Sequence, residues 1–164
     1  MEMIVLGIDH KLQSQDPALK TLISELAERE GITMIAEENR CSSNTLGRQV
    51  SESMNLPWLQ IDMSTEDRIK AGIDEKLANR MQIRGYDTNG APILAIRYAP
   101  VEDGIREEFW LGTIEGAAKE EKVLVICGCL HSVPFSEKAE RRGHRVVLKL
   151  FHPENLSALK PELY

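Results

Sequence analysis

Two copies of a short pattern, Gly-x-x-His, each follow an apolar run of strand length. The first copy runs from Gly7 to His10 and the second from Gly128 to His131. A glycine where a strand becomes a loop lets the backbone leave the sheet and direct the following histidine across its edge. An imidazole titrates near neutral pH, so it can transfer a proton or ligate a metal ion. His10 and His131 are therefore candidate catalytic or metal-ligating residues.

A carboxylate pair, Glu37 and Glu38, follows a third apolar run in the same way. In open α/β sheets, ligands bind at the carboxyl ends of the strands, so the three strand ends are expected to form one polar site. Successive strand residues face opposite sides of a sheet, and only one of the two glutamates is expected to act directly. We predict that His10, Glu37 and His131 bind a divalent cation or activate a water molecule, with Glu38 as a substrate contact.

Four further polar residues are candidates for supporting roles. Asp9 and Gln13 flank His10 and would orient its imidazole or contact the substrate, although Asp9 suits loop capping equally well. Arginine binds anions through a fork of N–H donors. Arg106 is predicted to stabilise negative charge that develops in the reaction. Arg40 is a second anion-binding candidate, for which a plain surface position is the stronger expectation.

The cysteines offer weaker chemistry. Cys127, Cys129 and His131 form a Cys-x-Cys-x-His pattern, but zinc sites usually separate paired cysteines by two to four residues and need four ligands. Cys127 also ends a buried apolar run, where a thiol is usually unreactive. We expect neither a zinc site nor a cysteine nucleophile. Trp110 is a candidate pocket wall, with core packing as the stronger expectation.

Apolar runs of strand length alternate with helical patterns along most of the chain. Asp16 caps a helix that has Pro17 in its first turn and Gly31 at its end, between two such runs. A β-α-β unit of this kind connects parallel strands. We predict a single α/β domain, residues 1–164, with a mainly parallel sheet flanked by helices. Strands are expected at 3–6, 32–36, 58–61, 123–127 and 145–150, and helices at 16–30, 42–54, 64–81, 103–120 and 132–142.

The stretch from 84 to 100 interrupts this alternation. Residues 86–90 are rich in turn formers and residues 93–98 carry a weak strand pattern, so we interpret the stretch as an excursion or a hairpin. It would serve as a lid, a dimer contact or a simple connection. In the helix that follows, Ile105, Phe109 and Ile114 are expected to face inward.

The composition is that of an ordinary soluble globular protein. The 164 residues are 42% hydrophobic and 28% charged, and the net charge of −6 weighs against a nucleic-acid partner, which usually requires a basic face. The longest apolar runs, of about six residues, are far shorter than the ~20 of a membrane-spanning helix. Three cysteines do not form a disulfide framework, which favours a cytoplasmic protein. The expected partner is a small-molecule or peptide substrate, and a homo-oligomer stays open.

The two Gly-x-x-His motifs and the strand-end Glu37 resemble the superfamily of TraB and PrgY pheromone-shutdown proteins, Tiki metalloproteases, erythromycin esterases and haem-binding ChaN proteins. The Tiki-like branch implies metal-dependent hydrolysis by two such motifs and a glutamate. The esterase branch implies a histidine that works without metal. The resemblance thus implies site roles for His10, Glu37 and His131. It covers the two ends of the chain and leaves residues 54–100 unmatched.

Three hypotheses about function follow from these residues. The first is a hydrolase that attacks a carbonyl or phosphoryl centre. The second is a ligand-binding or regulatory module that holds a nucleotide, haem or peptide in the same cleft without turnover, because one fold supports both classes. The third is an interaction protein with a decayed site, in which His10, Glu37 and His131 would lie far apart or be blocked.

Overall fold

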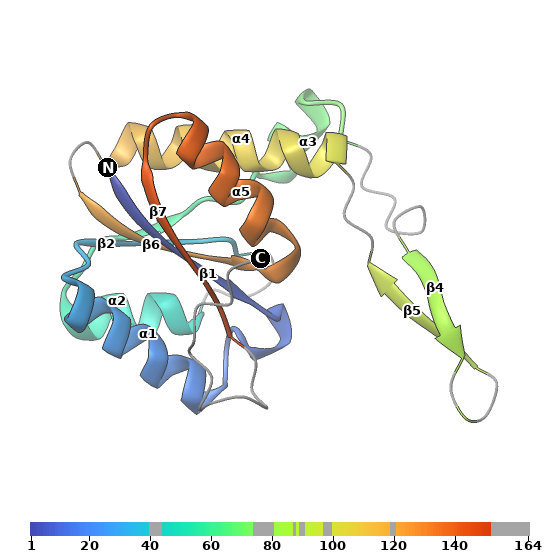
Figure 1. Ribbon diagram of the computed structural model, residues 1–164, viewed down its shortest axis with the longest axis horizontal. Helices are drawn as coiled ribbons and strands as arrows, with labels where there is room; N and C mark the ends of the chain where they lie inside the picture. The colour runs from blue at the N-terminus through green and yellow to red at the C-terminus, as the bar shows by residue number, and fades with distance from the viewer. Residues whose placement is uncertain are drawn as a thin grey trace.

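Five parallel strands form the central sheet of the protein. The structure, a computed structural model, describes residues 1–39, 44–73, 81–86, 88, 91–96, 100–118 and 121–151. The strand order is β3-β2-β6-β1-β7, and every neighbouring pair is parallel, which confirms the predicted α/β class. The strands are β1 (Glu2–Ile8), β2 (Met34–Glu37), β3 (Trp58–Gln60), β6 (Lys122–Gly128) and β7 (Arg145–Leu150) (Figure 1).

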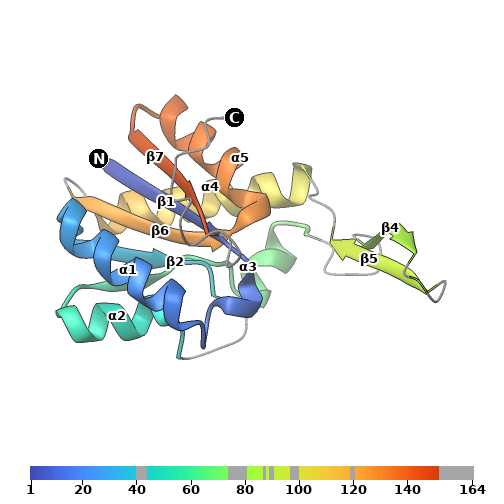
Figure 2. The same cartoon turned by 60° about the horizontal axis from the view of Figure 1, so that its bottom comes forward.

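Helices cover both faces of this sheet. α1 and α2 pack on one face, and α4 and α5 pack on the other (Figures 1 and 2). Side chains of a strand alternate between the two faces, so Ile4 and Leu6 of β1 join the core beside α1, while Met3 and Val5 join the core beside α4. The helices are α1 (Pro17–Glu30), α2 (Leu46–Met54), α3 (Thr65–Lys70), α4 (Pro100–Ala117) and α5 (Cys129–Arg141), and a short 3₁₀ turn, η1 (His10–Leu12), follows β1.

The helix α1 begins and ends as its sequence predicts. The side chain of Asp16 accepts a hydrogen bond of 2.8 Å from the backbone N–H of Leu19, and Pro17 occupies the first helical position. At the other end, Gly31 adopts a left-handed conformation with φ of 64°, which ends the helix. The predicted inward face is buried: Leu19, Leu22, Ile23, Leu26 and Ala27.

The strand ends that carry the candidate residues lie side by side. β6 is the central strand, and its last residue, Gly128, lies opposite Ile8 of β1. On the other side of β6, Glu37 of β2 lies opposite Ile126. Because the strands are parallel, these three carboxyl ends meet at one edge of the sheet. The loop after β1, the residues after β2 and the start of α5 therefore come together.

The predicted long helix at 64–81 is wrong. α3 ends at Lys70, Gly72 follows with a left-handed φ of 71°, and Met81 begins the strand β4 (Met81–Tyr86). A left-handed glycine ends a helix because the chain turns away from the helical path. The four-residue spacing that begins at Ile69 does not mark one buried helix face, since Ile69 is 68% exposed and Ile73, which is buried, lies beyond the end of α3. Residues 74–80 lie outside the described part of the chain.

The inward face of α4 also differs from the prediction. Ile114 is buried as expected, but Ile105 and Phe109 are each 37% exposed. In the first turns of α4, before Trp110, the buried face of the helix carries charged residues. An apolar periodicity cannot identify a buried face that begins with charged residues, so the prediction selected the wrong side of this part of the helix.

A two-stranded antiparallel sheet stands apart from the main sheet. β4 (Met81–Tyr86) pairs with β5 (Pro92–Ile96), and this hairpin projects from the side of the domain at which α4 begins (Figures 1 and 2). The structure thus confirms the hairpin interpretation of the 84–100 stretch, with a first strand that begins earlier, at Met81. In the part of the chain that the structure describes, no helix has the length and apolar character needed to cross a membrane.

Candidate functional site

The carboxylate of Glu38, directly after β2, connects His10 with Arg106. Its Oε2 atom lies 3.3 Å from Nε2 of His10, and its Oε1 atom accepts a hydrogen bond of 2.6 Å from Nη2 of Arg106. The backbone N–H of Gly128, at the end of β6, donates to Oε2 at 2.9 Å. Glu38 therefore joins groups from the loop after β1, the end of β6 and the helix α4.

The surroundings of Glu38 lower its pKa. Burial alone would raise the pKa of this carboxyl group, but the hydrogen bond and charge of His10 and the charge of Arg106 outweigh burial and hold the pKa well below its ordinary value. Glu38 is therefore ionised, and it supplies a buried negative charge directly behind the imidazole of His10.

Acidification is expected to destabilise the protein through Glu38. In the unfolded chain this carboxylate takes up a proton as the pH falls through its ordinary pKa of 4.5, whereas in the folded protein it stays ionised. The unfolded state then binds more protons, so the free energy of unfolding falls as the pH drops below about 5. Urea unfolding from about pH 7 to about pH 3 measures this slope. The Glu38→Gln variant is expected to show a shallower slope, and equal slopes in both proteins would contradict the assignment.

Arg106, from α4, is buried among three carboxylates. Besides Glu38, its Nη2 atom donates to Oδ1 of Asp62 at 2.9 Å, and its Nη1 atom donates to Oδ1 of Asp103 at 3.3 Å. Arg68 donates to the other oxygen of Asp62 at 2.5 Å and adds a second cation. Burial by itself would lower the pKa of Arg106, but Glu38 and Asp62 raise it, so the guanidinium keeps its charge.

Two members of this cluster, Asp62 and Asp103, are absent from the sequence-based prediction. Asp62 follows the short strand β3, so it lies at the same edge of the sheet as the other strand-end residues. Glu37 is expected in the site because it lies at the carboxyl end of a strand, and the same reasoning applies to Asp62. Asp103 lies one helical turn before Arg106, a spacing that is common on exposed helix surfaces and gives no sign of burial.

His131 lies in the first turn of α5, buried beside Arg106. This helix begins at Cys129, earlier than the predicted start at 132. Because a guanidinium can only donate, Nε2 of His131 accepts the 3.1 Å hydrogen bond from Arg106, and the ring proton lies on Nδ1. Nδ1 donates to Glu107 at 3.0 Å, and Lys138 donates to the other oxygen of Glu107 at 2.6 Å. His131 thus connects Arg106 with Glu107 and positions the guanidinium.

Trp110 packs against both His131 and Arg106. Its ring packs edge-on against His131 with 4.9 Å between ring centroids, and the guanidinium carbon of Arg106 lies 5.0 Å from the centroid of the same ring. The indole N–H donates to Oδ1 of Asp62 at 3.3 Å. Trp110 is fully buried, which confirms the expectation of core packing.

His10 is the exposed member of the site. Its side chain is 40% exposed, whereas that of Glu38 is buried. The amide nitrogen of Gln13 donates to Oε1 of Glu37 and to the carbonyl of Glu38, so the amide oxygen faces Nδ1 of His10, at 3.0 Å. Both ring nitrogens of His10 therefore face acceptors, which is the arrangement of a protonated imidazolium.

Glu37 points to the opposite face of the sheet from Glu38, as the alternation along a strand predicts. Its Oε2 atom accepts hydrogen bonds from Thr45 at 2.5 Å and from Trp58 at 2.9 Å. The start of α2 lies so close that an added Cβ at Gly47 would be 2.6 Å from the same oxygen. Burial raises the pKa of Glu37, and these hydrogen bonds limit the increase.

The expected cation site of His10, Glu37 and His131 is not formed by these residues as they are arranged. Glu37 is hydrogen-bonded on the α2 side of the sheet, and the ring nitrogens of His131 contact Arg106 and Glu107. The guanidinium of Arg106, itself a cation, contacts the carboxylates of Glu38, Asp62 and Asp103. Within the described residues, no group of three His, Cys, Asp or Glu side chains is placed to hold a metal ion.

The remaining candidates lie at the margin of the site or outside it. Asp9 is exposed and caps η1, where its side chain accepts a hydrogen bond of 2.9 Å from the backbone N–H of Lys11. Arg40 lies outside the described residues. Burial raises the pKa of the Cys127 thiol well above its ordinary value, as expected for an unreactive cysteine, while Cys129 is exposed at the start of α5.

The geometry of the site determines the chemistry that is available to it. No protein-family model, no curated protein and no solved structure matches the chain. The group that can meet a substrate is the imidazole of His10, and the groups that fix it are Glu38 and Gln13. An exposed imidazole held by a buried carboxylate is suited to proton transfer.

Proposed function

We propose that the protein is a hydrolase in which His10 transfers the proton, and that it acts on a carbonyl or phosphoryl centre of a small-molecule or peptide substrate. The observation that carries this proposal is the position of Glu38 between two cationic side chains. One of its carboxylate oxygens contacts the exposed imidazole of His10, and the other accepts a hydrogen bond from the buried guanidinium of Arg106. A proton-transfer group held in place by a third group is the arrangement that acid–base catalysis uses.

The proposed reaction uses His10 twice. After the imidazolium has released its proton to solvent, the neutral imidazole takes a proton from a water molecule as the water oxygen bonds to the carbonyl carbon or phosphorus. The imidazolium then donates this proton to the leaving oxygen or nitrogen as the bond from that atom to the carbon or phosphorus breaks, which restores the neutral imidazole and balances the reaction. Glu38 stays ionised throughout and favours the charged form of the ring by its proximity.

Arg106 and His131 are positioning residues in this proposal and do not contact the substrate. Arg106 is buried and surrounded by carboxylates, so we assign it the task of holding Glu38, in place of the charge-stabilising role expected from the sequence. His131 holds Arg106 in turn. Gln13 connects the imidazole of His10 with Glu37, which gives Glu37 a positioning role from the opposite face of the sheet.

The superfamily resemblance stays a prediction, and the geometry agrees better with one of its branches. The Tiki-like branch implies a metal ion, for which the described residues form no site. The erythromycin esterase branch implies a histidine that works without metal. The arrangement of His10 and Glu38 supports that second alternative for this chain.

Replacing His10 by glutamine tests the proposal. Wild-type protein is first screened against ester, amide and phosphate substrates. In His10→Gln, any hydrolysis found is expected to fall by roughly 10²-fold or more, because the amide keeps a hydrogen-bond donor near Glu38 but cannot exchange a proton. The rate constants are compared at equal concentrations of folded protein. Undiminished turnover would refute proton transfer by His10.

His144→Gln is the matched control. His144 also contacts a carboxylate, that of Glu115 at 2.8 Å, but it precedes β7 and so lies at the amino ends of the strands. Its replacement is expected to leave turnover unchanged. If wild-type protein hydrolyses nothing in the screen but binds a nucleotide, haem or peptide through His10, a binding module replaces the hydrolase as the function of this site.

A further inference from the structure

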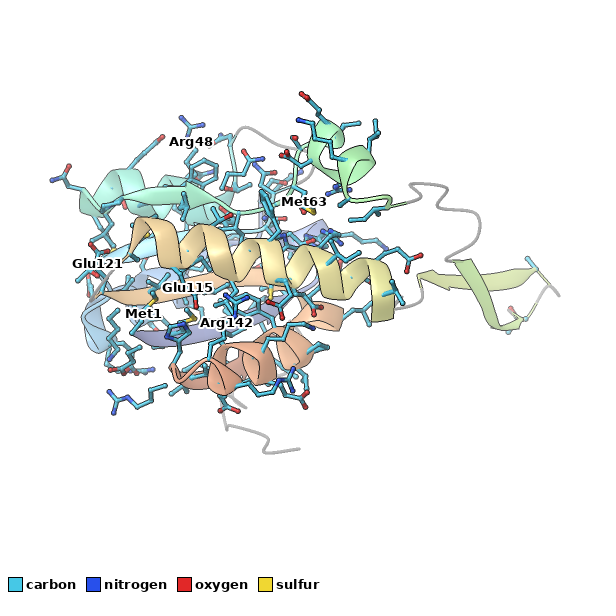
Figure 3. The ribbon with its side chains drawn as sticks, turned by 90° about the horizontal axis from the view of Figure 1, so that it is seen from above. Met1, Arg48, Met63, Glu115, Glu121 and Arg142 are labelled. Carbon is cyan, nitrogen blue, oxygen red and sulfur yellow. The ribbon has the colours of Figure 1, made fainter. Side chains whose placement is uncertain are left out.

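A series of polar contacts connects the middle of α5 with the imidazole of His10. α4 and α5 lie side by side on one face of the sheet (Figures 1 and 3). Between them, Lys138 of α5 donates to Oε2 of Glu107 at 2.6 Å, and Oε1 of Glu107 accepts from Nδ1 of His131 at 3.0 Å. The series consists, in order, of Lys138, Glu107, His131, Arg106, Glu38 and His10.

Glu107 determines which ring nitrogen of His131 carries the proton. An ammonium can only donate, so one carboxylate oxygen of Glu107 accepts from Lys138. The other oxygen also only accepts, and Nδ1 of His131 therefore donates to it. Nε2 is then an acceptor, as the guanidinium of Arg106 requires. Glu107 thus selects the tautomer of His131 that can hold Arg106.

The other tautomer of His131 would compete with Arg106. Nε2 of His131 lies 4.0 Å from Oε1 of Glu38 and 3.9 Å from Oδ1 of Asp103. The same two oxygens accept hydrogen bonds from Arg106. A proton on Nε2 would oppose the N–H groups of the guanidinium and would be attracted to these oxygens. The contact between Glu38 and His10 would then change, because Arg106 holds the carboxylate of Glu38 in place.

We propose that Glu107 and Lys138 are positioning residues, which control the surroundings of His10 through the tautomer of His131. Glu107 is fully buried and the side chain of Lys138 is only 16% exposed, so solvent screens their interaction little. The tautomer can be measured without a substrate, so this inference does not rest on the proposed function. Only the expected loss of turnover rests on it.

Glu107→Gln is expected to move the ring proton of His131 from Nδ1 to Nε2. Lys138 can only donate, so it keeps the oxygen of the introduced amide on its own side, and the amide NH2 group then faces Nδ1. Nitrogen-15 spectra of the histidine rings distinguish a nitrogen that carries a proton from one that accepts. The spectra are recorded at about pH 8, above the ordinary imidazole pKa of about 6.5.

Two further variants separate this tautomer effect from a general loss of structure. Lys138→Met keeps the carboxylate of Glu107, so the proton is expected to stay on Nδ1 of His131. The double variant Glu107→Gln/Lys138→Met leaves the amide free to turn its oxygen toward Nδ1, so the proton is expected to return there. The ring resonances of His10 are expected to shift in Glu107→Gln and to return toward their wild-type positions in the double variant.

Glu115→Gln is the matched control. Its carboxylate has the same kinds of neighbours: Oε2 accepts from Arg142 at 2.6 Å, and Oε1 lies 2.8 Å from Nε2 of His144. Glu115, on α4, and Arg142, at the end of α5, are labelled in Figure 3. His144 precedes β7, at the amino ends of the strands. The substitution is therefore expected to leave the ring resonances of His10 unchanged.

The position of the proton on His131 decides the inference. A proton on Nε2 or on both nitrogens in wild type would overturn it, and so would a Glu107→Gln variant that keeps its proton on Nδ1 or a double variant that does not regain it. A change of tautomer that leaves the resonances of His10 in place would show that Glu107 does not position His10.

Turnover tests the connection with the proposed function separately. If wild type hydrolyses a substrate, Glu107→Gln is expected to lose roughly 10²-fold in rate, the scale of the effect of a displacement of about 1 Å, and the double variant is expected to regain most of it. Unchanged turnover in Glu107→Gln would refute the positioning role. A wild type that hydrolyses nothing would contradict the proposed function, while the spectra would still decide this inference.

Discussion

Replacing Arg106 by methionine is expected to lower the free energy of unfolding by about 3–5 kcal/mol, because breaking a buried ion pair leaves its partners uncompensated. The partners here are the carboxylates of Glu38, Asp62 and Asp103, which all lie within 3.3 Å of the guanidinium. Methionine fills much of the volume but brings no charge. Urea unfolding followed by tryptophan fluorescence measures the change, since Trp110 packs on the same guanidinium.

Arg48→Met is the control for this prediction. Arg48 also pairs with a carboxylate, that of Glu52 at 2.9 Å, but both side chains are exposed and lie one helical turn apart on α2. Its guanidinium carbon also lies 5.4 Å from the ring centroid of Trp58. Such an ion pair contributes about 0.3–0.5 kcal/mol, and an exposed cation–π contact contributes about 0.5–1 kcal/mol. If Arg106→Met cost as little as Arg48→Met, Arg106 would not be the cation that holds the buried carboxylates together. The comparison thus separates a buried network from an ordinary surface contact.

Gly128→Ala is expected to displace His10 and to reduce the proposed hydrolysis by about 10²-fold, the scale of the effect of a displacement of about 1 Å. A Cβ at this position would lie 2.6 Å from Nε2 of His10 and 3.5 Å from Oε2 of Glu38. The backbone of Gly128 has φ of −59° and ψ of 140°, which alanine adopts without strain. The expected effect therefore comes from displacement of the His10 imidazole and not from strain in the backbone. The ring resonances of His10 in nuclear magnetic resonance spectra are expected to shift, which can be measured even without a known substrate.

Gly104→Ala is the matched glycine substitution. A Cβ at Gly104, in α4, would have only the flexible end of Lys138 within reach, at an ordinary contact distance of 3.9 Å. Alanine in a helix is expected to raise the free energy of unfolding by roughly 0.5–1 kcal/mol relative to glycine. The His10 resonances are expected to stay where they are in wild type. A Gly128→Ala spectrum that matches the Gly104→Ala spectrum would refute the close approach of His10 to Gly128.

The edge of the sheet at which the candidate residues meet could be predicted from the sequence. Three apolar runs of strand length, each followed by polar residues, predict parallel strands whose carboxyl ends lie together. That alternation also predicts opposite faces for Glu37 and Glu38. Which of these two glutamates contacts the histidines depends on which face of the sheet α4 and α5 cover. Local sequence patterns contain no information about which face that is.

The buried charges of α4 could not be predicted from periodicity. The inward face of this helix begins with Asp103, Arg106 and Glu107, and such residues normally mark the exposed side of a helix. They are buried here because each charge finds an opposite charge: Arg106 pairs with Asp62 after β3 and with Asp103, and Glu107 pairs with Lys138 in α5. Pairs so far apart in the sequence become visible only in three dimensions.

The position of β1 in the sheet has a consequence for how the protein folds. Its two neighbours are β6 and β7, so that Glu2 lies opposite both Lys122 and Arg145, although β1 is the first of these strands to be synthesised. Parallel pairing over such sequence separations is slow, because a long loop must close before any contact stabilises it. His10 and Glu38 consequently acquire their surroundings only when β6 and α5 have been added, so a growing chain carries no assembled site before these two elements have left the ribosome.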